Sequence, residues 1–291
     1  AVALVPRLFS LCGCAQGAAA RLAMAAARGE VPASGGLARA VALEAIGEHL
    51  WRLLLDWPPL LGLPPEKEAF LGWRKRLLAV KDEDETARLS SDLRAWLAAR
   101  PPVPACRDQA VAAPALLMPW CSAADWAAVD LDEDFAQAPL LGDQAAETGA
   151  LARQAEVPEV ADLLLENWRV AARIAARWAE LEFLASGLVE PGLLQGWLDA
   201  APAAPGVGLA RVETARGLLL HLMQVKDDRV ERYVIVAPTE WNFHARGAFA
   251  GELVGSPAAA RDEAEGLARR LALALDPCVN YQVAVEEVEH A

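Results

Sequence analysis

Apolar residues recur at helical spacing over most of the first 200 positions. This pattern predicts helices over residues 18–27, 37–56, 66–80, 85–99 and 158–186. The helix over 37–56 is expected to end at Pro58 and Pro59, because proline lacks the amide hydrogen that a helix interior needs. Between residues 101 and 150 prolines and glycines interrupt the pattern, and the acidic run 130–134 is expected to be a solvated loop.

The apolar period changes after residue 206. Three segments with strand-like patterns, 209–213, 218–225 and 230–237, predict an antiparallel sheet whose last two strands are joined by a turn at 226–228. The preceding segment 200–208, which contains two prolines, is the best candidate for a linker.

Ser256 followed by Pro257 predicts the cap and first position of a final helix that runs to about Leu275. The expected fold class is α+β, mainly α, with a small antiparallel sheet near the C-terminal third. We expect one domain over 1–291, with a helical part at 1–200, the sheet at 207–240 and a C-terminal part at 256–291.

The charge balance excludes one class of partner. The 291 residues include 27 Lys and Arg against 40 Asp and Glu, a net charge of −13. Nucleic-acid binding requires a basic surface that neutralises phosphates, so no nucleic-acid partner is expected. No apolar stretch reaches the roughly 18 residues that span a bilayer, so no membrane insertion is expected. The apolar run 8–20 is shorter still, and we interpret it as part of the mature protein rather than as a secretion signal.

The cysteines do not form the pattern of a disulfide-bonded scaffold. They are five in number and spread along the chain, at Cys12, Cys14, Cys106, Cys121 and Cys278. An odd, scattered set favours free or metal-binding thiols in a reducing compartment, so a cytoplasmic location is expected.

Four short segments carry the candidate chemistry. They read RLFSLCGCAQ at 7–16, ETGALAR at 147–153, ETARGLLLH at 213–221 with APTEWN at 237–242, and DPCVNY at 276–281. In this order they resemble motifs of the large subunit of nickel–iron hydrogenases: Arg-x-Cys-Gly-x-Cys-x-x-x-His, Val-Gly-Pro-Leu-Ala-Arg, Glu-Ala-Pro-Arg-Gly…His with Pro-Thr-Thr-Trp-Asn, and Asp-Pro-Cys-x-x-Cys. The resemblance covers nearly the whole chain and implies a hydrogenase large-subunit-like fold.

The departures from these motifs fall on the metal ligands. In the family, four thiolates hold nickel, and two of them also bridge to an iron that carries cyanide and carbon monoxide. Here Cys12 and Cys278 stand at ligand positions, whereas Phe9 and Tyr281 replace the other two cysteines and Gln16 replaces the histidine. A phenol with a pKa near 10 is a poor substitute for a soft thiolate, so neither nickel nor hydrogen activation is expected.

The iron half of the family's site is better preserved. By resemblance, Arg216 corresponds to the arginine that faces one cyanide, and Thr239 to a hydroxyl or backbone donor facing the other. Asp276 corresponds to the acid beside the C-terminal cysteine, where it could orient Arg216. An arginine fork suits this role because it cannot lose its charge.

A chain that keeps the iron-site residues and lacks the nickel ligands resembles the hydrogenase maturation proteins of the HupK/HoxV type. Residues 44–58 also look typical of that branch. The resemblance implies a non-catalytic scaffold for an iron–dicyano–carbonyl unit or its precursor, held through Cys12 and Cys278. The implied partners are hydrogenase assembly chaperones and the hydrogenase large-subunit precursor. Cys14 matches no ligand position, so it is either a spare ligand that compensates for Phe9 or a bystander.

Simpler interpretations stand beside these. The cysteines could be ordinary buried thiols, and Arg216 could form a structural ion pair with Asp276. His221 is expected to be a satisfied core histidine, and His49 to orient a neighbouring residue or to pack. At the level of the chain, the alternatives are a metal-free structural subunit and a divergent hydrogenase large subunit.

Overall fold

Residues 2–9, 11–30, 35–100, 115–258 and 260–286 are described by the structure, a computed structural model. Its helices are α1 (Val5–Leu8), α2 (Gly13–Ala27), α3 (Gly35–Trp51), the π-helical turn η1 (Arg52–Asp56), α4 (Trp57–Leu60), α5 (Lys67–Ala79), α6 (Glu83–Ala98), α7 (Ala123–Ala127), α8 (Glu133–Gln137), α9 (Ala150–Gln154), α10 (Pro158–Leu165), α11 (Arg169–Gly187), the 3-10 turn η2 (Pro191–Leu194), α12 (Pro238–Asn242), α13 (Ala248–Leu253) and α14 (Arg261–Leu275). Its strands are β1 (Leu116–Leu117), β2 (Ala146–Glu147), β3 (Leu198–Ala204), β4 (Val207–Thr214), β5 (Gly217–Lys226) and β6 (Arg229–Val236).

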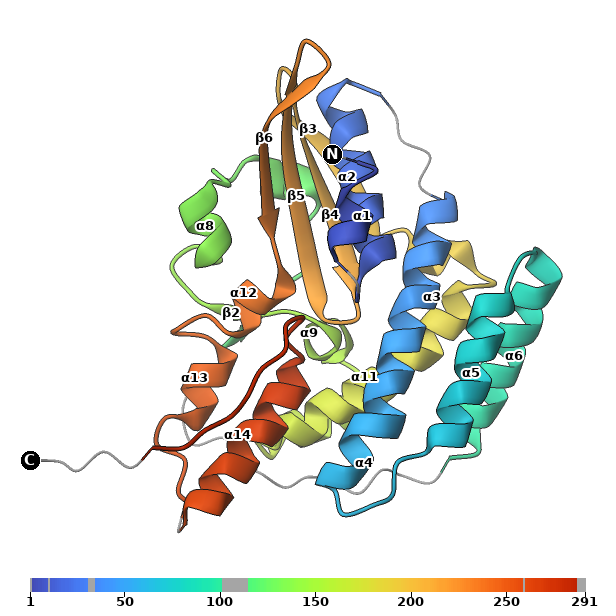
Figure 1. The fold of residues 1–291 in the computed structure, drawn as a ribbon, viewed down its shortest axis with the longest axis vertical. Coiled ribbons are helices and arrows are strands. Elements are labelled where there is room, and N and C mark those ends of the chain that lie inside the picture. Colours follow the sequence, from blue (N-terminus) through green and yellow to red (C-terminus); the bar gives the residue numbers. More distant parts are fainter. Residues whose placement is uncertain (1, 10, 31–34, 101–114, 259, 287–291) are drawn as a thin grey trace, which may run out of the picture.

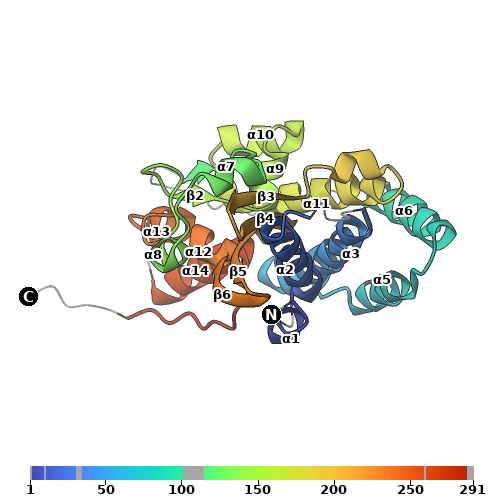
Figure 2. The same ribbon diagram turned by 90° about the horizontal axis from the view of Figure 1, so that it is seen from above.

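The molecule has a sheet at one end and helices at the other (Figure 1). The sheet is antiparallel with strand order β3-β4-β5-β6, and β1 pairs with β2 separately and in parallel. Helix α2 packs on β3, β4 and β5, and α7 and α8 contact the sheet as well. Helices α3, α5, α6 and α11 form the helical part, and α14 lies beside α11 (Figure 2). The predicted fold class is therefore confirmed.

Helix α2 approaches the sheet unusually closely because its contact face is made of alanines. The side chains of Ala15, Ala19 and Ala23 are fully buried. Opposite them stands Gly208 of β4, where a Cβ atom would lie 2.2 Å from the carbonyl oxygen of Ala23. Small residues on both sides let the two backbones meet. The apolar run 8–20 is thus largely part of this core helix.

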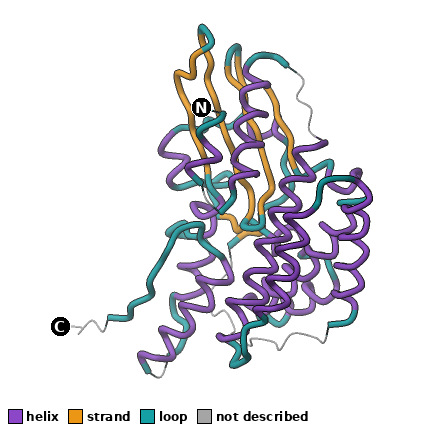
Figure 3. The backbone as a smooth tube through the Cα atoms, turned by 45° about the vertical axis from the view of Figure 1, so that its right-hand side comes forward, coloured by secondary structure: helices purple, strands orange, loops and turns teal. Residues whose placement is uncertain are grey.

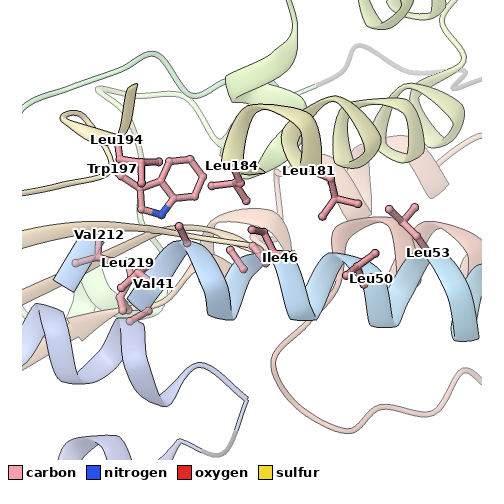
Figure 4. Close-up of a cluster of buried hydrophobic side chains, with 14 of the residues drawn as sticks. Val41, Ile46, Leu50, Leu53, Leu181, Leu184, Leu194, Trp197, Val212 and Leu219 are labelled. Carbon is pink, nitrogen blue, oxygen red and sulfur yellow. The ribbon is translucent and has the colours of Figure 1, made fainter. Parts of the chain in front are cut away.

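The main core lies where α3 packs against α11 and meets the ends of the strands β4 and β5 (Figure 4). Ile46 and Leu50 of α3 are fully buried, as are Leu181 and Leu184 of α11. Residues 194–198 and the inner faces of β4 and β5 complete this cluster. In the described ranges, none of the helices has the length and apolar character needed to cross a membrane.

The three predicted strands are confirmed, and so is the turn between the last two. Lys226 pairs with Arg229, which leaves a loop of two residues, Asp227 and Asp228. Both have a positive φ, at 48° and 59°, as a type I′ hairpin turn requires.

The predicted linker at 200–208 is wrong, because most of it forms the edge strand β3 and the turn into β4. Pro202 fits in β3 because an edge strand need not donate a hydrogen bond on its outer side, and the register shifts just after it. The acidic run 130–134 is also more ordered than predicted: Asp132 caps α8 by accepting a hydrogen bond from the Phe135 amide at 2.7 Å.

Three helix boundaries differ from those predicted. The chain stays helical through Pro58 and Pro59, because both lie in the first turn of α4, where no amide hydrogen is needed. The predicted helix 158–186 is two helices, broken at Asn167, whose φ is 57°. Ser256 does not cap α14, since its hydroxyl donates to the carbonyl of Glu252 at 2.6 Å at the end of α13.

Candidate functional site

Arg216 lies in the two-residue turn between β4 and β5, deep in the molecule, with 3% of its surface exposed. The hydroxyl oxygen of Thr214 accepts hydrogen bonds from the amides of Arg216 and Gly217, each at 3.1 Å. Gly217 has a φ of 134°, and a Cβ atom there would lie 2.5 Å from the Thr148 methyl carbon. This turn therefore requires glycine beside the arginine.

The second and third motifs meet at this turn. Asn242 Nδ2 donates to the carbonyl of Arg216 at 3.3 Å, and Asn242 Oδ1 accepts from the Thr148 amide at 2.9 Å. The Thr148 hydroxyl oxygen in turn accepts from the amide of Leu218 at 2.9 Å. Residues 147–149, 213–218 and 237–242 are consequently held as one unit by polar contacts.

The Arg216 guanidinium carries unused donors. Its Nη1 donates to Oε2 of Glu48, which extends from α3, and its Nε lies 3.4 Å from Oδ1 of Asp276. In the described part of the chain, neither Nε nor Nη2 of Arg216 makes a hydrogen bond. Buried donors without acceptors cost free energy, so a missing acceptor is expected at this position.

Asp276 is the centre of the ion pairs. It follows α14 in a left-handed conformation with a φ of 52°, and its side chain is fully buried. Arg52 contacts its Oδ1 from Nη2 at 2.8 Å, and Arg177 lies 3.5 Å from its Oδ2. Burial alone raises the pKa of Asp276, but the guanidinium groups of Arg216, Arg177 and Arg52 lower it overall. Asp276 therefore stays charged, as its predicted orienting role requires.

Thr239 and Cys278 contact each other directly. The Thr239 hydroxyl donates to the Cys278 sulfur at 3.2 Å, and the Cys278 amide lies 3.1 Å from the same hydroxyl oxygen. Thr239 belongs to α12, which follows the sheet, so the third and fourth motifs meet here. The Cys278 thiol is partly exposed.

The first motif lies at the start of α2, where Glu44 fixes the backbone. The amides of Cys14 and Ala15 donate to the Glu44 carboxylate at 2.7 and 2.9 Å. Burial and the neighbouring Glu48 carboxylate raise the pKa of Cys12 to about 12, although Arg216 opposes the rise. Burial and Glu44 raise the pKa of Cys14 to about 11. Both groups are therefore thiols at neutral pH.

Some of the predicted site residues are in direct contact with one another, whereas Cys14 makes no such contact with the rest among the described residues. Direct contacts join Arg216 to Asp276 and Thr239 to Cys278, and the charges of Glu48 and Arg216 affect the pKa of Cys12. Cys14 is exposed and its backbone is bound to Glu44. Cys106 lies outside the described residues. Cys121 precedes α7 and is partly buried.

Sequence reasoning missed three charged residues of α3 and η1: Glu44, Glu48 and Arg52. They are spaced four residues apart, so they lie on one helical face, directed at the cysteine loop, Arg216 and Asp276 respectively. The signal that could have found them is this charged repeat within a helix whose other positions are largely apolar.

The predictions for both histidines are confirmed. His221 is fully buried between Gln16 and Tyr233, with contacts of 2.9 and 2.8 Å, and burial lowers its pKa to about 3. His49 lies between Glu180 at 2.8 Å and Arg177 at 3.2 Å, and burial lowers its pKa. His49 thereby positions Arg177 beside Asp276.

A network of buried ion pairs supports the site from behind. Arg153 of α9 binds Glu180 of α11 at 2.6 Å and Glu213 of β4 at 2.6 Å. A second cluster, formed by Arg169, Arg173, Glu147 and Glu252, joins α11 to β2 and α13. Across the described ranges, His, Cys, Asp and Glu side chains do not gather in threes or more in a way that could hold a metal ion.

Known proteins similar to this chain fall into two groups. The family profile described as "Nickel-dependent hydrogenase" matches residues 194–283. The hydrogenase expression/formation protein HupK of Bradyrhizobium diazoefficiens is 30% identical, covering 99% of this chain and 87% of its own length. HoxV of Cupriavidus necator is 34% identical, covering 98% and 87%. The uptake hydrogenase large subunit of Rubrivivax gelatinosus is 32% identical over 30% of this chain and 15% of its own.

Solved hydrogenase structures share the fold. The Ni-Fe-Se hydrogenase of Desulfovibrio vulgaris Hildenborough in the reduced state has a TM-score of 0.63 and 17% identity, over 96% of this chain and 88% of that one. An NAD+-reducing [NiFe]-hydrogenase in the H2-reduced state has a TM-score of 0.60 and 15% identity, over 96% and 87%. The predicted large-subunit-like architecture is confirmed.

Proposed function

Because this chain belongs to the hydrogenase expression/formation proteins of the HupK and HoxV type, we propose that it is a non-catalytic scaffold that carries an Fe(CN)2CO unit, or its precursor, to the hydrogenase large subunit. The iron unit is cargo, so it is received and released rather than kept. Hydrogenase assembly chaperones and the large-subunit precursor are the partners that this role requires, in the cytoplasm.

The observation that carries this proposal is the buried Arg216 guanidinium: its Nη2 has no acceptor among the described residues, and its Nε makes only an ion-pair contact of 3.4 Å with Asp276. A cyanide nitrogen bound to iron is a strong acceptor, and an anionic ligand removed from water must be paired with donors. Glu48 and Asp276 hold the guanidinium from other sides, so its orientation is fixed before a ligand arrives.

The thiols are suited to hold a group that brings most of its own ligands. Cys12 and Cys278 would bind the iron, and Thr239 beside Cys278 would offer its hydroxyl to the second cyanide. Two thiols alone are a small ligand set for a bare metal ion, whereas iron with three diatomic ligands needs few protein donors. For the same reason a nickel centre, which needs four thiolates, is not expected here.

Infrared spectroscopy tests this function directly. The full chain is purified without oxygen from a hydrogenase-forming host and examined in the cyanide and carbonyl stretching region. We expect these bands in the wild-type protein and expect Cys12→Ala and Cys278→Ala to lose them without unfolding. Cys121→Ala is the matched control and should keep them. Absence of the bands from wild-type protein while the assembly partners are present would contradict the proposal.

One observation favours the metal-free alternative. Arg216, Glu48, Asp276 and Arg52 form an ion-pair cluster that needs no metal to hold it together. A structural subunit would use this cluster only for folding. Iron well below one atom per chain, in protein isolated with every assembly partner present, would support this alternative.

A further inference from the structure

A groove of about 680 Å³ opens beside the candidate site. Its walls come from η1 and α4, from the last turns of α14, and from the extended segment 277–283. At its inner end lie Asp276 and Pro277, the two residues before Cys278. Its volume lies within the range of about 300–1,000 Å³ that is usual for ligand-binding pockets.

The chemistry of the walls fits a polypeptide better than a charged small molecule. Leu55, Pro59, Leu60 and Leu273 give the groove an apolar lining, and Tyr281 adds an aromatic ring that is 44% exposed. The charged lining residues already have partners: Arg52 pairs with Asp56 and Asp276, and Arg269 pairs with Glu265. These pairs leave little free charge for a small ion.

One wall offers unused backbone groups. The segment 277–286 forms neither helix nor strand, and within the described ranges its backbone groups make no hydrogen bonds with other backbone groups. The Cys278 amide is already used, since it donates to the Thr239 hydroxyl oxygen at 3.1 Å. The other backbone amides and carbonyls can pair with a second extended chain alongside, with apolar side chains filling the adjoining pocket. The occupant favoured by this wall is therefore an extended peptide.

Transfer of the iron unit to a partner indicates that the peptide contains a cysteine. If Cys278 binds the iron, as the proposed function has it, release requires another ligand to replace its sulfur. An incoming thiolate forms a new Fe–S bond as the Fe–S bond to Cys278 breaks, and the proton lost by the incoming thiol goes to the Cys278 thiolate. The oxidation state of the iron does not change.

We propose that this groove receives an extended, cysteine-bearing segment of the partner protein that exchanges the iron unit with this chain, an inference that rests on the proposed function. The segment would lie along residues 277–283, so that its thiol reaches the iron past Pro277. The groove is thus the docking surface for handover, and the Arg216 side of the site remains enclosed.

Photo-cross-linking to a defined partner tests the docking. The photoreactive residue p-benzoylphenylalanine is placed at position 60 or 281 of the full chain, which is mixed with the purified hydrogenase large-subunit precursor and irradiated. We expect cross-links from both positions to a precursor peptide that contains cysteine. The matched control is position 165 on α10, where the native leucine is 85% exposed but does not line the groove.

A transfer measurement complements the cross-links. Leu60→Asp places a carboxylate among the leucine and proline side chains of the groove, and we expect it to slow transfer of the iron unit at least about tenfold, with unchanged cyanide and carbonyl bands on the loaded scaffold. Leu165→Asp should leave the transfer rate unchanged.

The outcomes separate this inference from the proposed function. A precursor that accepts the iron unit without cross-linking at positions 60 and 281 would overturn the groove inference, as would a cross-linked peptide without cysteine or a normal rate with Leu60→Asp. Absence of infrared bands from the wild-type scaffold would overturn the proposed function instead. Cross-links at both groove positions would then still support docking there.

Discussion

At the scale of single residues, the site depends on side chains whose partners are remote in sequence. Arg216 needs Glu48, which lies 168 positions earlier, and Thr239 needs Cys278, which lies 39 positions later. These pairs are buried or partly buried, so each group depends on its partner to offset the loss of water. Removing one member of a buried pair leaves the other charge uncompensated, which usually costs more than the pair itself contributes.

Glu48 gives a prediction at this scale. Glu48→Ala removes the acceptor of Arg216 Nη1, and we expect the free energy of unfolding to fall by about 3 kcal/mol, because the buried guanidinium loses the nearer of its two acidic partners and keeps only Asp276 at 3.4 Å. Glu48→Gln keeps an acceptor oxygen and should cost less. Urea unfolding of the two variants measures the difference.

The surface pair Arg28–Asp228 is the control for this measurement. The exposed fraction of its side chains is 41% and 88%, so Asp228→Ala should change stability by less than about 1 kcal/mol. Equal losses for Glu48→Ala and Asp228→Ala would show that Glu48 does not hold Arg216 in solution.

At the scale of elements, small residues on helix α2 and on the sheet allow the two to pack closely. The alanine face of α2 lies so near β4 that the Cα of Gly208 contacts the α2 backbone. The cysteine loop begins directly before this helix. The position of Cys12 relative to the Arg216 turn is thus set by the fit between a helix and a strand. The extended wall of the groove likewise depends on α14 ending at Asp276.

Two glycine substitutions test this fit, with opposite expected signs. Gly208→Ala puts a Cβ atom 2.2 Å from a backbone oxygen of α2, and such overpacking should cost about 1–3 kcal/mol of stability. Gly72→Ala in α5 meets no atom within 4 Å and should stabilise the protein by about 0.5–1 kcal/mol, because alanine favours helix. Thermal unfolding of both variants provides the comparison, and a neutral Gly208→Ala would contradict the close approach.

At the scale of the whole molecule, buried ion pairs connect the helical part to the sheet. Glu180 of α11 and Glu147 of β2 are both fully buried and paired with arginines. Burial alone raises the pKa of each carboxyl, but Arg153 lowers the pKa of Glu180 to about 2, and Arg173 with Arg169 lowers that of Glu147 to about 2. The helical part and the sheet are therefore joined by ion pairs whose carboxylates become neutral when they are protonated at low pH.

This arrangement predicts the direction of the pH dependence. A carboxyl whose pKa is lower in the folded than in the unfolded protein stabilises the fold above its unfolded pKa, near 4.5 here, and this contribution is lost as the pH falls towards 2. His221, whose folded pKa is about 3, acts in the same direction below its unfolded value of 6.5. Glu48 acts in the opposite direction, because burial raises its folded pKa to about 8 and its protonation favours the fold as the pH falls from 8 to about 4.5. We therefore expect the decline in unfolding free energy to be clearest below pH 4.5, where Glu180, Glu147 and His221 act together.

A single variant isolates the carboxyl contribution. Glu180→Gln cannot titrate, so its unfolding free energy should decline less steeply than that of the wild type between pH 4.5 and 2, although it starts lower. Denaturant titrations at several pH values measure both slopes. Parallel slopes for wild type and variant would show that Glu180 is not charged in the folded protein.

Local pattern was sufficient for much of the architecture. The spacing of apolar residues predicts α2, α5 and α6 and the three strands β4 to β6, because the face that an element buries is written in its own sequence. It failed where a distant partner decides the outcome. Serine is a residue type that often caps helices, yet the hydroxyl of Ser256 donates to the carbonyl of Glu252. The prolines and small residues of β3 are typical of a linker, yet β3 pairs with β4.

For the site, the sequence by itself determined the kinds of residues available: two thiols at motif positions, an arginine, a threonine and an acid, with Phe9 and Tyr281 where thiols would otherwise stand. These residue types can be identified from the order of the four motifs along the chain. Only the tertiary structure decided which donors stay free. Glu48 and Asp276 take contacts of Arg216 and leave its Nη2 without an acceptor among the described residues. The loop segment that follows α14 (Figure 3) forms one wall of the groove. The physical reason is that a hydrogen bond or ion pair depends on distance in space, and the elements that supply its two ends are brought together only by packing.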